Sequence, residues 1–452
     1  MDSIFIGFLV LGILSWLLSK FYRWLGRQLR RAHDTLEVLT GLSAKLACSA
    51  RHISGFDRSR ILHDLKGYSW AFRFVDLKFE NSQVIARIGR IRQSRATYHK
   101  GLGCTLGSTL LYDPSRIRVP TITPDHHTWP QEGNSGHSSL KAEALLDQIL
   151  KEDLENQLET RALIAIQNGE LVAESYAPLI SRETKLLGWS MAKSLTALLV
   201  GRMETLGLAD IHAQNLFAEW HGDGKSRITL QQLLQMCPGL AFDENYAPGS
   251  DVTRMLFTTP GTADYALRSK LQHPPGSHFH YSSGTTNLLA LWMHRKLGGT
   301  QACIDFLFRE FLEPLQMANT LLETDACGVF TGSSYAYASA RDWARLGQLI
   351  LDNGCIGSQA LISPDWIHRA TSPNTSANDP RYGYQLWLNS APGTPPRYQT
   401  LPADACFMLG NREQKLMVCP SHRAVVVRLG WTSGDYPMER QFARILSCLG
   451  NP

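Results

Sequence analysis

The chain has 452 residues, enough for one large domain or two to three ordinary ones, and its 44% hydrophobic content excludes intrinsic disorder. The net charge of +5 is modest, and its excess lies behind the N-terminal apolar run and between Arg87 and Lys100. We find no basic face interleaved with aromatic residues and no nucleic-acid-binding module, so we expect no nucleic-acid partner.

The N-terminus has the pattern of a membrane anchor. The stretch from Ile4 to Leu18 is apolar except for Ser15, and Phe21 and Trp24 extend it toward the roughly 20 residues that cross a bilayer. No positive charge precedes the run and no small-residue cleavage site follows it closely, which argues against a cleaved signal peptide. We therefore predict a single-pass anchor helix with a basic flank over residues 1–31.

The positive charges beside this run all lie on its C-terminal side, and they are Lys20, Arg23, Arg27, Arg30 and Arg31. Positive flanks favour the cytoplasmic side of a membrane, so this rule places the rest of the chain in the cytoplasm.

Residues 33–135 form an N-terminal accessory segment whose role the sequence does not define. A helical stretch around Leu36–Cys48 is followed by alternating polar and apolar residues over 72–79 and 84–91, which predict two strands. Residues 114–139 are rich in Pro, His, Gly and Ser and predict an irregular connection to the next domain.

The nine cysteines form no C-x-x-C pair and no zinc-type spacing, so buried, structural thiols are expected. Cys48 and Cys104 stand alone in the N-terminal segment, where a disulfide and two free thiols are equally compatible with the spacing. Three histidines cluster at His273, His278 and His280 without a carboxylate or cysteine at ligand spacing. We expect these histidines to be structural or exposed and the protein to use no metal or organic cofactor.

The main domain is predicted over residues 136–452. A helix near Leu140–Leu154 leads into two β-runs, 162–167 and 170–176, around the turn Asn168-Gly169, a strong hairpin signal. Helical patterns dominate to about residue 360. The C-terminal part is predicted to hold two strands and a closing helix, at Lys415–Cys419, Ala424–Leu429 and Met438–Leu449.

Strands at both ends of the domain, around a helical middle, predict an α/β (α+β) fold. One antiparallel sheet would be assembled from both ends of the domain and flanked by helices, with a helical insertion subdomain between them.

The tetrapeptide Ser190-Met191-Ala192-Lys193 is the chief catalytic candidate because it opens a strongly helical run. Positions i and i+3 share a helix face, so the Ser190 hydroxyl and the Lys193 amine become neighbours. A hydroxyl needs a base to become a nucleophile, and a neutral lysine can supply one. A second formal match, Ser138 to Lys141, lies in a polar Gly/Ser-rich stretch that we do not expect to open a helix.

A second motif, Tyr281-Ser282-Ser283, precedes another helical pattern. A cationic Lys193 nearby would favour loss of the Tyr281 proton, so that the two residues could activate Ser190 and return the proton to a leaving group. A tyrosine that merely closes a loop is the alternative. Tyr246, in the loop after Pro238-Gly239, is either a substrate contact or an ordinary surface residue.

Together these residues carry a resemblance to a known family. The chain resembles the serine β-lactamase and penicillin-binding-protein superfamily, and within it the class C-like branch of 6-aminohexanoate-dimer hydrolase and related esterases. The similarity covers about residues 140 to 450. Its matching blocks, in chain order, are Gly188–Ser194, Ile228–Met236, Pro238–Leu240, Phe279–Gly284 and Arg341–Gly347.

The resemblance implies roles for single residues. Ser190 would be the acylated nucleophile, Lys193 the base and Tyr281 the proton relay, with Ser283 at a position where many relatives have Asn. The family's third motif, Lys/His-Thr/Ser-Gly, is matched at Met408-Leu409-Gly410 by Gly410 alone.

At this third motif no cation is available at Met408 to grip a substrate carboxylate. The N–H groups of Ser190 and Asn411 are the candidates for the oxyanion hole. The bulky pair Arg412-Glu413 is expected to alter the mouth of the site.

The sequence thus predicts a membrane-anchored serine hydrolase that acts on small amides or esters through an acyl-Ser190 intermediate. The degraded third motif leaves an alternative, a non-catalytic protein that keeps the fold to bind a ligand or partner. The membrane side stays open, because the charge rule favours the cytoplasm whereas relatives are commonly exported to the periplasm.

Overall fold

The computed structural model describes residues 2–107, 109–123, 131–132 and 137–450, with side-chain surroundings for all of these except 2–15 and 131–139. The predicted boundary between residues 135 and 136 lies outside the described residues.

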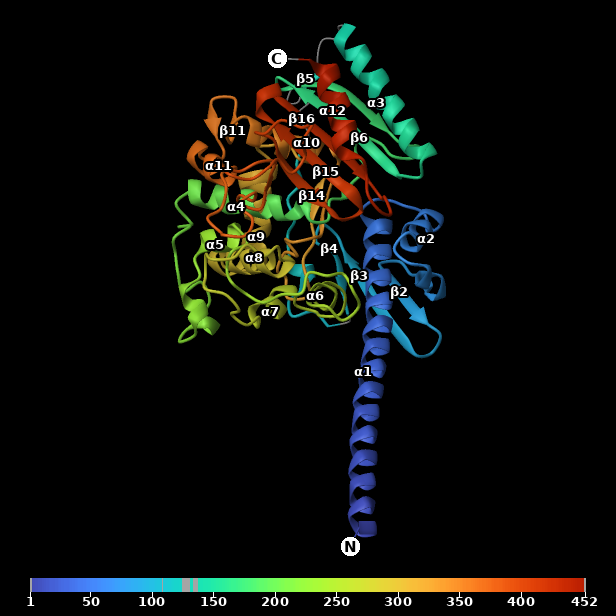
Figure 1. Cartoon of the computed structure of the whole chain (residues 1–452). Helices are drawn as coiled ribbons and strands as arrows, with labels where there is room; N and C mark the ends of the chain where they lie inside the picture. Colours follow the sequence, from blue (N-terminus) through green and yellow to red (C-terminus); the bar gives the residue numbers. More distant parts are fainter. Residues whose placement is uncertain (1, 108, 124–130, 133–136, 451–452) are drawn as a thin grey trace.

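A seven-stranded sheet forms the centre of the main domain (Figure 1), with the strand order β13-β14-β15-β16-β6-β7-β5. Its pairs are antiparallel except for β5 with β7. The bounds are β5 Gln131–Glu132, β6 Thr160–Gln167, β7 Glu170–Tyr176, β13 Trp387–Leu388, β14 Cys406–Gly410, β15 Gln414–Cys419 and β16 Ala424–Gly430.

The pairing of β16 with β6, in a register that sets Val425 opposite Ile166, joins the two ends of the domain as the sequence predicts. Both strands are buried along nearly their whole length because helices cover both faces of the sheet. At the β6–β7 turn Asn168 and Gly169 both have positive φ, as a two-residue hairpin requires.

The helices α3 (His137–Glu155) and α12 (Met438–Leu449) pack together on the sheet, and α10 (Ala340–Leu351) also lies against it. The helical insertion is arranged beside the sheet (Figure 1). Its helices are α4 Met191–Thr205, α5 Leu230–Leu234, α6 Asp251–Phe257, α7 Thr262–Leu267, α8 Ser283–Leu297 and α9 Thr300–Phe306, with α11 Pro364–Ala370 later in the chain.

Short strands complete the main domain. They are β8 Leu186–Leu187, β9 Thr320–Leu322 and β10 Ala336–Ala338, in the order β8-β10-β9, and the hairpin β11 Cys355–Ile356 with β12 Gln359–Ala360.

The N-terminal segment is a four-stranded antiparallel sheet packed on a long helix, α1 (Asp2–His52). Its other elements are α2 Arg58–Lys66, β1 Asp76–Phe79, β2 Gln83–Ile88, β3 Arg92–His99 and β4 Gly103–Leu106. The strand predicted over 72–79 begins only at Asp76, because Trp70–Phe74 form a 3-10 helix capped by Ser69.

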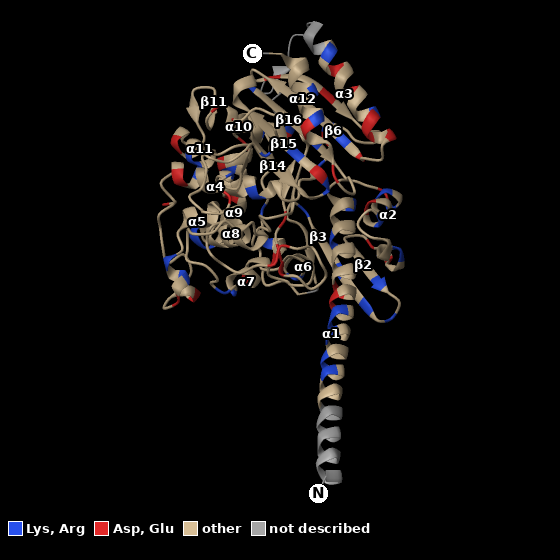
Figure 2. Ribbon diagram, in the orientation of Figure 1, with Lys and Arg blue, Asp and Glu red and all other residues tan. Residues whose placement is uncertain are grey.

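The first half of α1 projects away from the rest of the molecule (Figure 1), and blue segments mark its lysines and arginines (Figure 2). Within the described part of the chain, no helix combines the length and apolar character that a membrane span needs. This finding does not support the predicted anchor helix. Most of the apolar run from Ile4 to Leu18 lies outside the residues whose side chains are described.

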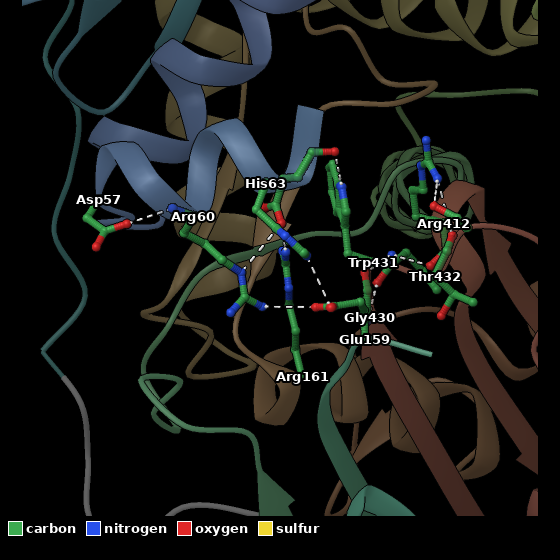
Figure 3. A network of polar contacts seen from close by, with 12 residues as sticks. Asp57, Arg60, His63, Glu159, Arg161, Arg412, Gly430, Trp431 and Thr432 are labelled. Atoms are coloured by element: carbon green, nitrogen blue, oxygen red, sulfur yellow. Dashed lines mark hydrogen bonds and ion pairs between the residues drawn. The ribbon is translucent and has the colours of Figure 1, made fainter. Parts of the chain in front are cut away.

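The N-terminal segment and the main domain share a buried polar junction (Figure 3). Arg161 on β6 pairs with Asp64 on α2 at 2.5 Å, and both side chains are under 10% exposed. The Trp431 indole N–H donates to the Asp64 carbonyl at 2.9 Å. Around this core, Glu159 contacts His63 and Arg60.

Cys48 and Cys104 are both buried free thiols in this structure. Burial and a hydrogen bond with Cys48 raise the pKa of the Cys104 thiol, so the two sulfurs are neighbours without a disulfide between them.

Candidate active site

Ser190 occupies the N-cap position of α4, where the first turn of a helix has N–H groups without intrahelical partners. The residue before it, Trp189, has φ +49, a left-handed conformation that side chains rarely adopt. Gly188 is pressed against Trp343, whose ring would lie 2.1 Å from an added Cβ. A tight, strained turn thus positions the Ser190 hydroxyl.

Lys193 lies one turn along α4 and is 1% exposed. Its Nζ donates to Ser190 Oγ at 2.9 Å, to Ser283 Oγ at 3.0 Å and to the Ser333 carbonyl at 3.0 Å. Burial lowers the pKa of Lys193 to about 8, although the charge of Glu244 opposes this shift. A lysine with this pKa is partly neutral near physiological pH and can accept a proton.

Tyr281 precedes α8, and its ring stacks on Trp387 with centroids 5.1 Å apart. Burial and the negative charge of Glu244 raise the pKa of Tyr281, while a hydrogen bond with Ser190 partly opposes the shift. The expectation that Lys193 would ease the loss of this proton is therefore wrong. The Lys193 ammonium lies over the ring face, 4.8 Å from the centroid, and Tyr281 stays a neutral proton donor.

Ser283 is the first residue of α8 and is fully buried. Its backbone N–H donates to Glu244 Oε2 at 2.7 Å, and its hydroxyl donates to Glu244 Oε1 at 2.5 Å. Burial raises the pKa of Glu244, and the positive charge of Lys193 opposes that shift. Sequence reasoning selected the loop but missed Glu244, because no spacing rule links a loop carboxylate to a helix start 39 residues later.

Tyr246 lies in the same loop and is 38% exposed. Burial of its phenol raises its pKa well above the usual value, with further contributions from Glu244 and Tyr281. The structure therefore brings Tyr246 to the edge of the same cluster of polar groups.

Gly410 ends β14 beside the turn that carries Ser190. A Cβ at Gly410 would lie 2.2 Å from the Gly188 carbonyl oxygen, so only glycine permits this close approach. Asn411 follows directly and begins a short 3-10 turn. Met408 shares the face of Gly410 by strand alternation and is 1% exposed, which places an apolar side chain at the position where the family resemblance predicts a cation.

Arg412 and Glu413 both have positive φ and attach the loop to its surroundings. The Arg412 guanidinium lies 3.7 Å from the centroid of the Tyr68 ring and donates to Ser433 Oγ at 2.9 Å. Glu413 pairs with Lys415 at 3.0 Å. The pair thus connects the loop to the N-terminal segment and to the sheet.

The second S-x-x-K match also stands on a helix, since Ser138 and Lys141 belong to the start of α3. The prediction that no helix opens there is wrong. Burial distinguishes the two lysines, because Lys141 is exposed whereas Lys193 is enclosed. Among the three clustered histidines, His273 and His278 stack on each other, and His280 contacts the Phe242 carbonyl at 2.7 Å.

Comparison with known families agrees with this geometry. The family model described as Beta-lactamase matches residues 146–446, which is more than half of the chain. The chain belongs to the β-lactamase family.

One relative is the 6-aminohexanoate-dimer hydrolase of Paenarthrobacter ureafaciens, 26% identical over 237 residues. The match covers 48% of this chain and 58% of the relative, so it spans little more than half the length of that protein.

Two solved structures share the fold. A family VIII carboxylesterase matches with a TM-score of 0.55 and 13% identity, over 70% of this chain and 99% of its own. A class C β-lactamase matches with a TM-score of 0.51 and 11% identity, over 71% of this chain and 98% of its own. These likenesses support a β-lactamase/transpeptidase-like α/β fold.

Proposed function

We propose that this protein is a serine hydrolase that cleaves small amides or esters through an acyl-Ser190 intermediate. The observation that carries the proposal is the buried Lys193 amine, 2.9 Å from Ser190 Oγ, with its pKa lowered to about 8. The names of the relatives, a 6-aminohexanoate-dimer hydrolase and a carboxylesterase, support an amide or ester as substrate.

In the proposed reaction, neutral Lys193 takes the proton of Ser190 as its oxygen attacks the substrate carbonyl. The N–H groups of Ser190 and Asn411 stabilise the oxyanion that forms. Tyr281 remains protonated and hydrogen-bonds Ser190, so it is placed to donate a proton to the leaving group. Water then hydrolyses the acyl-enzyme.

The substrate is proposed to lack a carboxylate beside the scissile bond. Met408 presents a thioether in place of a cation, and the Glu244 carboxylate adds negative charge near the site. A substrate carboxylate beside Met408 would meet this thioether and not a cation, and the Glu244 carboxylate would repel it.

The test is turnover of a neutral activated ester by the wild-type protein, the Ser190→Ala variant and a Ser138→Ala control. We expect Ser190→Ala to lose turnover and fluorophosphonate labelling while its thermal unfolding stays cooperative. The Ser138→Ala control should match the wild type. Equal rates for the wild type and Ser190→Ala would exclude the hydrolase.

A second candidate is a non-catalytic ligand- or partner-binding protein that keeps the fold. The replacement of the expected cation by Met408 favours it, as does the unusual pair Arg412-Glu413. Equal ester turnover in the wild type and Ser190→Ala, at the background rate, would support this candidate.

We also propose that residues 1–31 attach the protein to a membrane. At the end of the apolar run and just after it, the described part of α1 exposes Trp16, Phe21 and Trp24 over about half of each side chain, and arginines follow. Fractionation of the full chain and a variant lacking residues 2–31 tests attachment. A reporter that is active on one side of the membrane decides between cytoplasm and periplasm.

A further inference from the structure

Lys193 in its ammonium form cannot accept the Ser190 proton, and its three hydrogen bonds limit where its own extra proton can go. As an ammonium it uses all three N–H groups, toward Ser190 Oγ, Ser283 Oγ and the Ser333 carbonyl. To accept the Ser190 proton it must first lose one of its own. A carbonyl oxygen is too weak a base to take that proton, and Ser190 is the group to be deprotonated, so of these partners Ser283 remains.

Ser283 leads directly to a carboxylate. Its hydroxyl accepts from Lys193 Nζ at 3.0 Å and donates its own hydrogen to Glu244 Oε1 at 2.5 Å. The two bonds have one direction, from the amine through the hydroxyl to the carboxylate. The second Glu244 oxygen is held by the Ser283 backbone N–H at 2.7 Å, which fixes the orientation of the carboxylate.

On the basis of the proposed hydrolase, we propose that Glu244 is the terminal acceptor of a proton relay that runs from Lys193 through Ser283. In the forward step a proton leaves Lys193 Nζ for Ser283 Oγ, while the Ser283 hydroxyl proton passes to Glu244 Oε1. Lys193 and Glu244 both become neutral, Ser283 is unchanged, and Lys193 gains the lone pair that Ser190 needs. The reverse step restores the pair after turnover. Glu244 is thus a positioning residue that acts through Lys193.

The electrostatic surroundings favour this exchange. Burial lowers the pKa of Lys193 and raises that of Glu244, which brings the two groups closer in proton affinity. The other ionisable groups around Glu244 are His280 and Tyr281 ahead of α8, Tyr246 on its own loop, and Tyr382. The three tyrosines have raised pKa values and stay neutral, so they do not compete for the proton.

A structural role for Glu244 is the alternative, because a carboxylate at the N-terminus of α8 also stabilises that helix. The test therefore compares Glu244→Ala, Ser283→Ala, the double variant and Asp243→Asn. Asp243 is an exposed carboxylate in the same loop and serves as the matched control. The measurements are kcat/KM for a neutral activated ester from pH 5 to 10, thermal unfolding, and kcat/KM with added formate.

We expect each single variant to lower kcat/KM toward pH 5, where Lys193 is an ammonium that needs the relay, by about a hundredfold, the scale of one acid–base group. Above pH 8 Lys193 is already neutral, so the alkaline plateau should stay close to that of the wild type. The double variant should lose no more than either single variant, because both cut one relay. Formate, a small carboxylate, should restore part of the activity of Glu244→Ala and none of Ser283→Ala. Asp243→Asn should match the wild type.

Three results would overturn the relay. A rate below pH 8 that is unchanged or raised, with the acid limb moved to lower pH, would reduce Glu244 to a fixed charge near Lys193. If the losses of kcat/KM follow a lowered thermal unfolding midpoint and formate does not restore activity, the role of Glu244 is structural. If the loss of kcat/KM in the double variant equals the product of the two single losses, Glu244 and Ser283 act independently and not in one relay. Failure of the hydrolase itself is distinguishable, because wild type and Ser190→Ala would then have equal rates.

Discussion

Lys45 Nζ lies 2.7 Å from Glu323 Oε2, and the two side chains, 278 positions apart in the sequence, are 3% and 0% exposed. The other Glu323 oxygen accepts from Ser49 Oγ at 2.9 Å and from the Cys104 N–H at 2.6 Å. A buried carboxylate is thus satisfied almost entirely by the N-terminal segment. This segment is therefore built into the main domain, not attached beside it.

Removal of one partner of this ion pair should strongly destabilise the fold. In Lys45→Ala the Glu323 carboxylate stays buried without its counter-charge, and we expect the free energy of unfolding to fall by about 3–5 kcal/mol. Urea denaturation measures the change. Lys151→Ala, which breaks an exposed pair with Glu155, is the control and should cost less than about 1 kcal/mol. Similar losses in both variants would contradict the buried pair as a stabilising contact.

Truncations should show that the exposed first part of α1 is dispensable for activity, whereas the part packed in the N-terminal segment is required for folding. A variant without residues 2–31 should keep kcat/KM within about twofold, because residues 16–32 are largely exposed and lie away from the site. A variant without residues 2–107 loses Lys45, Asp64 and Tyr68 and should not give a soluble, folded protein. Gel filtration and ester turnover measure both effects, and a folded, active product of the longer deletion would refute the integration of the segment.

Sequence patterns predicted the main elements because each depends on local chemistry. The hairpin at Asn168-Gly169 and the closing helix Met438–Leu449 follow from turn residues and periodicity. The junction with the N-terminal segment could not be predicted, because pairs such as Arg161 with Asp64 join residues 97 apart without any repeating pattern.

The candidate site shows the same division. Ser190 and Lys193 are one helical turn apart, so a local rule brings them together, and Ser283 reaches Lys193 as the family pattern implies. Glu244 and the raised pKa of Tyr281 depend on burial, which sequence spacing does not encode. Sequence reasoning therefore missed Glu244 and assigned the pKa shift of Tyr281 wrongly, because both depend on desolvation in the folded protein.

The hydrolysis rate should depend on the protonation of Lys193. Only the neutral amine accepts the Ser190 proton, so kcat/KM for a neutral ester should rise with pH and reach half its plateau near pH 8. Lys193→Arg should remove activity at every pH, because a guanidinium does not deprotonate. An acid limb centred near pH 6.5, the ordinary histidine range, would assign the base to another residue.

The burial of Lys193 should also lower the free energy of unfolding. Its pKa falls from 10.5 in the unfolded chain to about 8 in the folded protein, so the unfolded state binds the proton more tightly. The penalty is therefore complete below pH 8 and disappears as the pH rises toward 10.5.

We expect Lys193→Met to raise the free energy of unfolding at pH 7 by on the order of 3 kcal/mol, less the hydrogen bonds it loses. Urea denaturation at pH 7 and pH 10.5 measures the difference. A gain that is equal at the two pH values would show that packing, not charge burial, causes it.

The contact of Gly410 with Gly188 should be essential for the oxyanion hole. In Gly410→Ala the new Cβ would meet the Gly188 carbonyl oxygen at 2.2 Å, so β14 must move away from the Ser190 turn. The Asn411 N–H would move with the strand, and loss of one oxyanion donor lowers kcat by about 10²–10³-fold. Steady-state kinetics with a neutral ester measures this loss.

Gly26→Ala is the matched control, because a Cβ at Gly26 meets nothing within 4 Å and alanine favours the helix. If Gly410→Ala kept the kcat of this control, the end of β14 would have no part in stabilising the oxyanion.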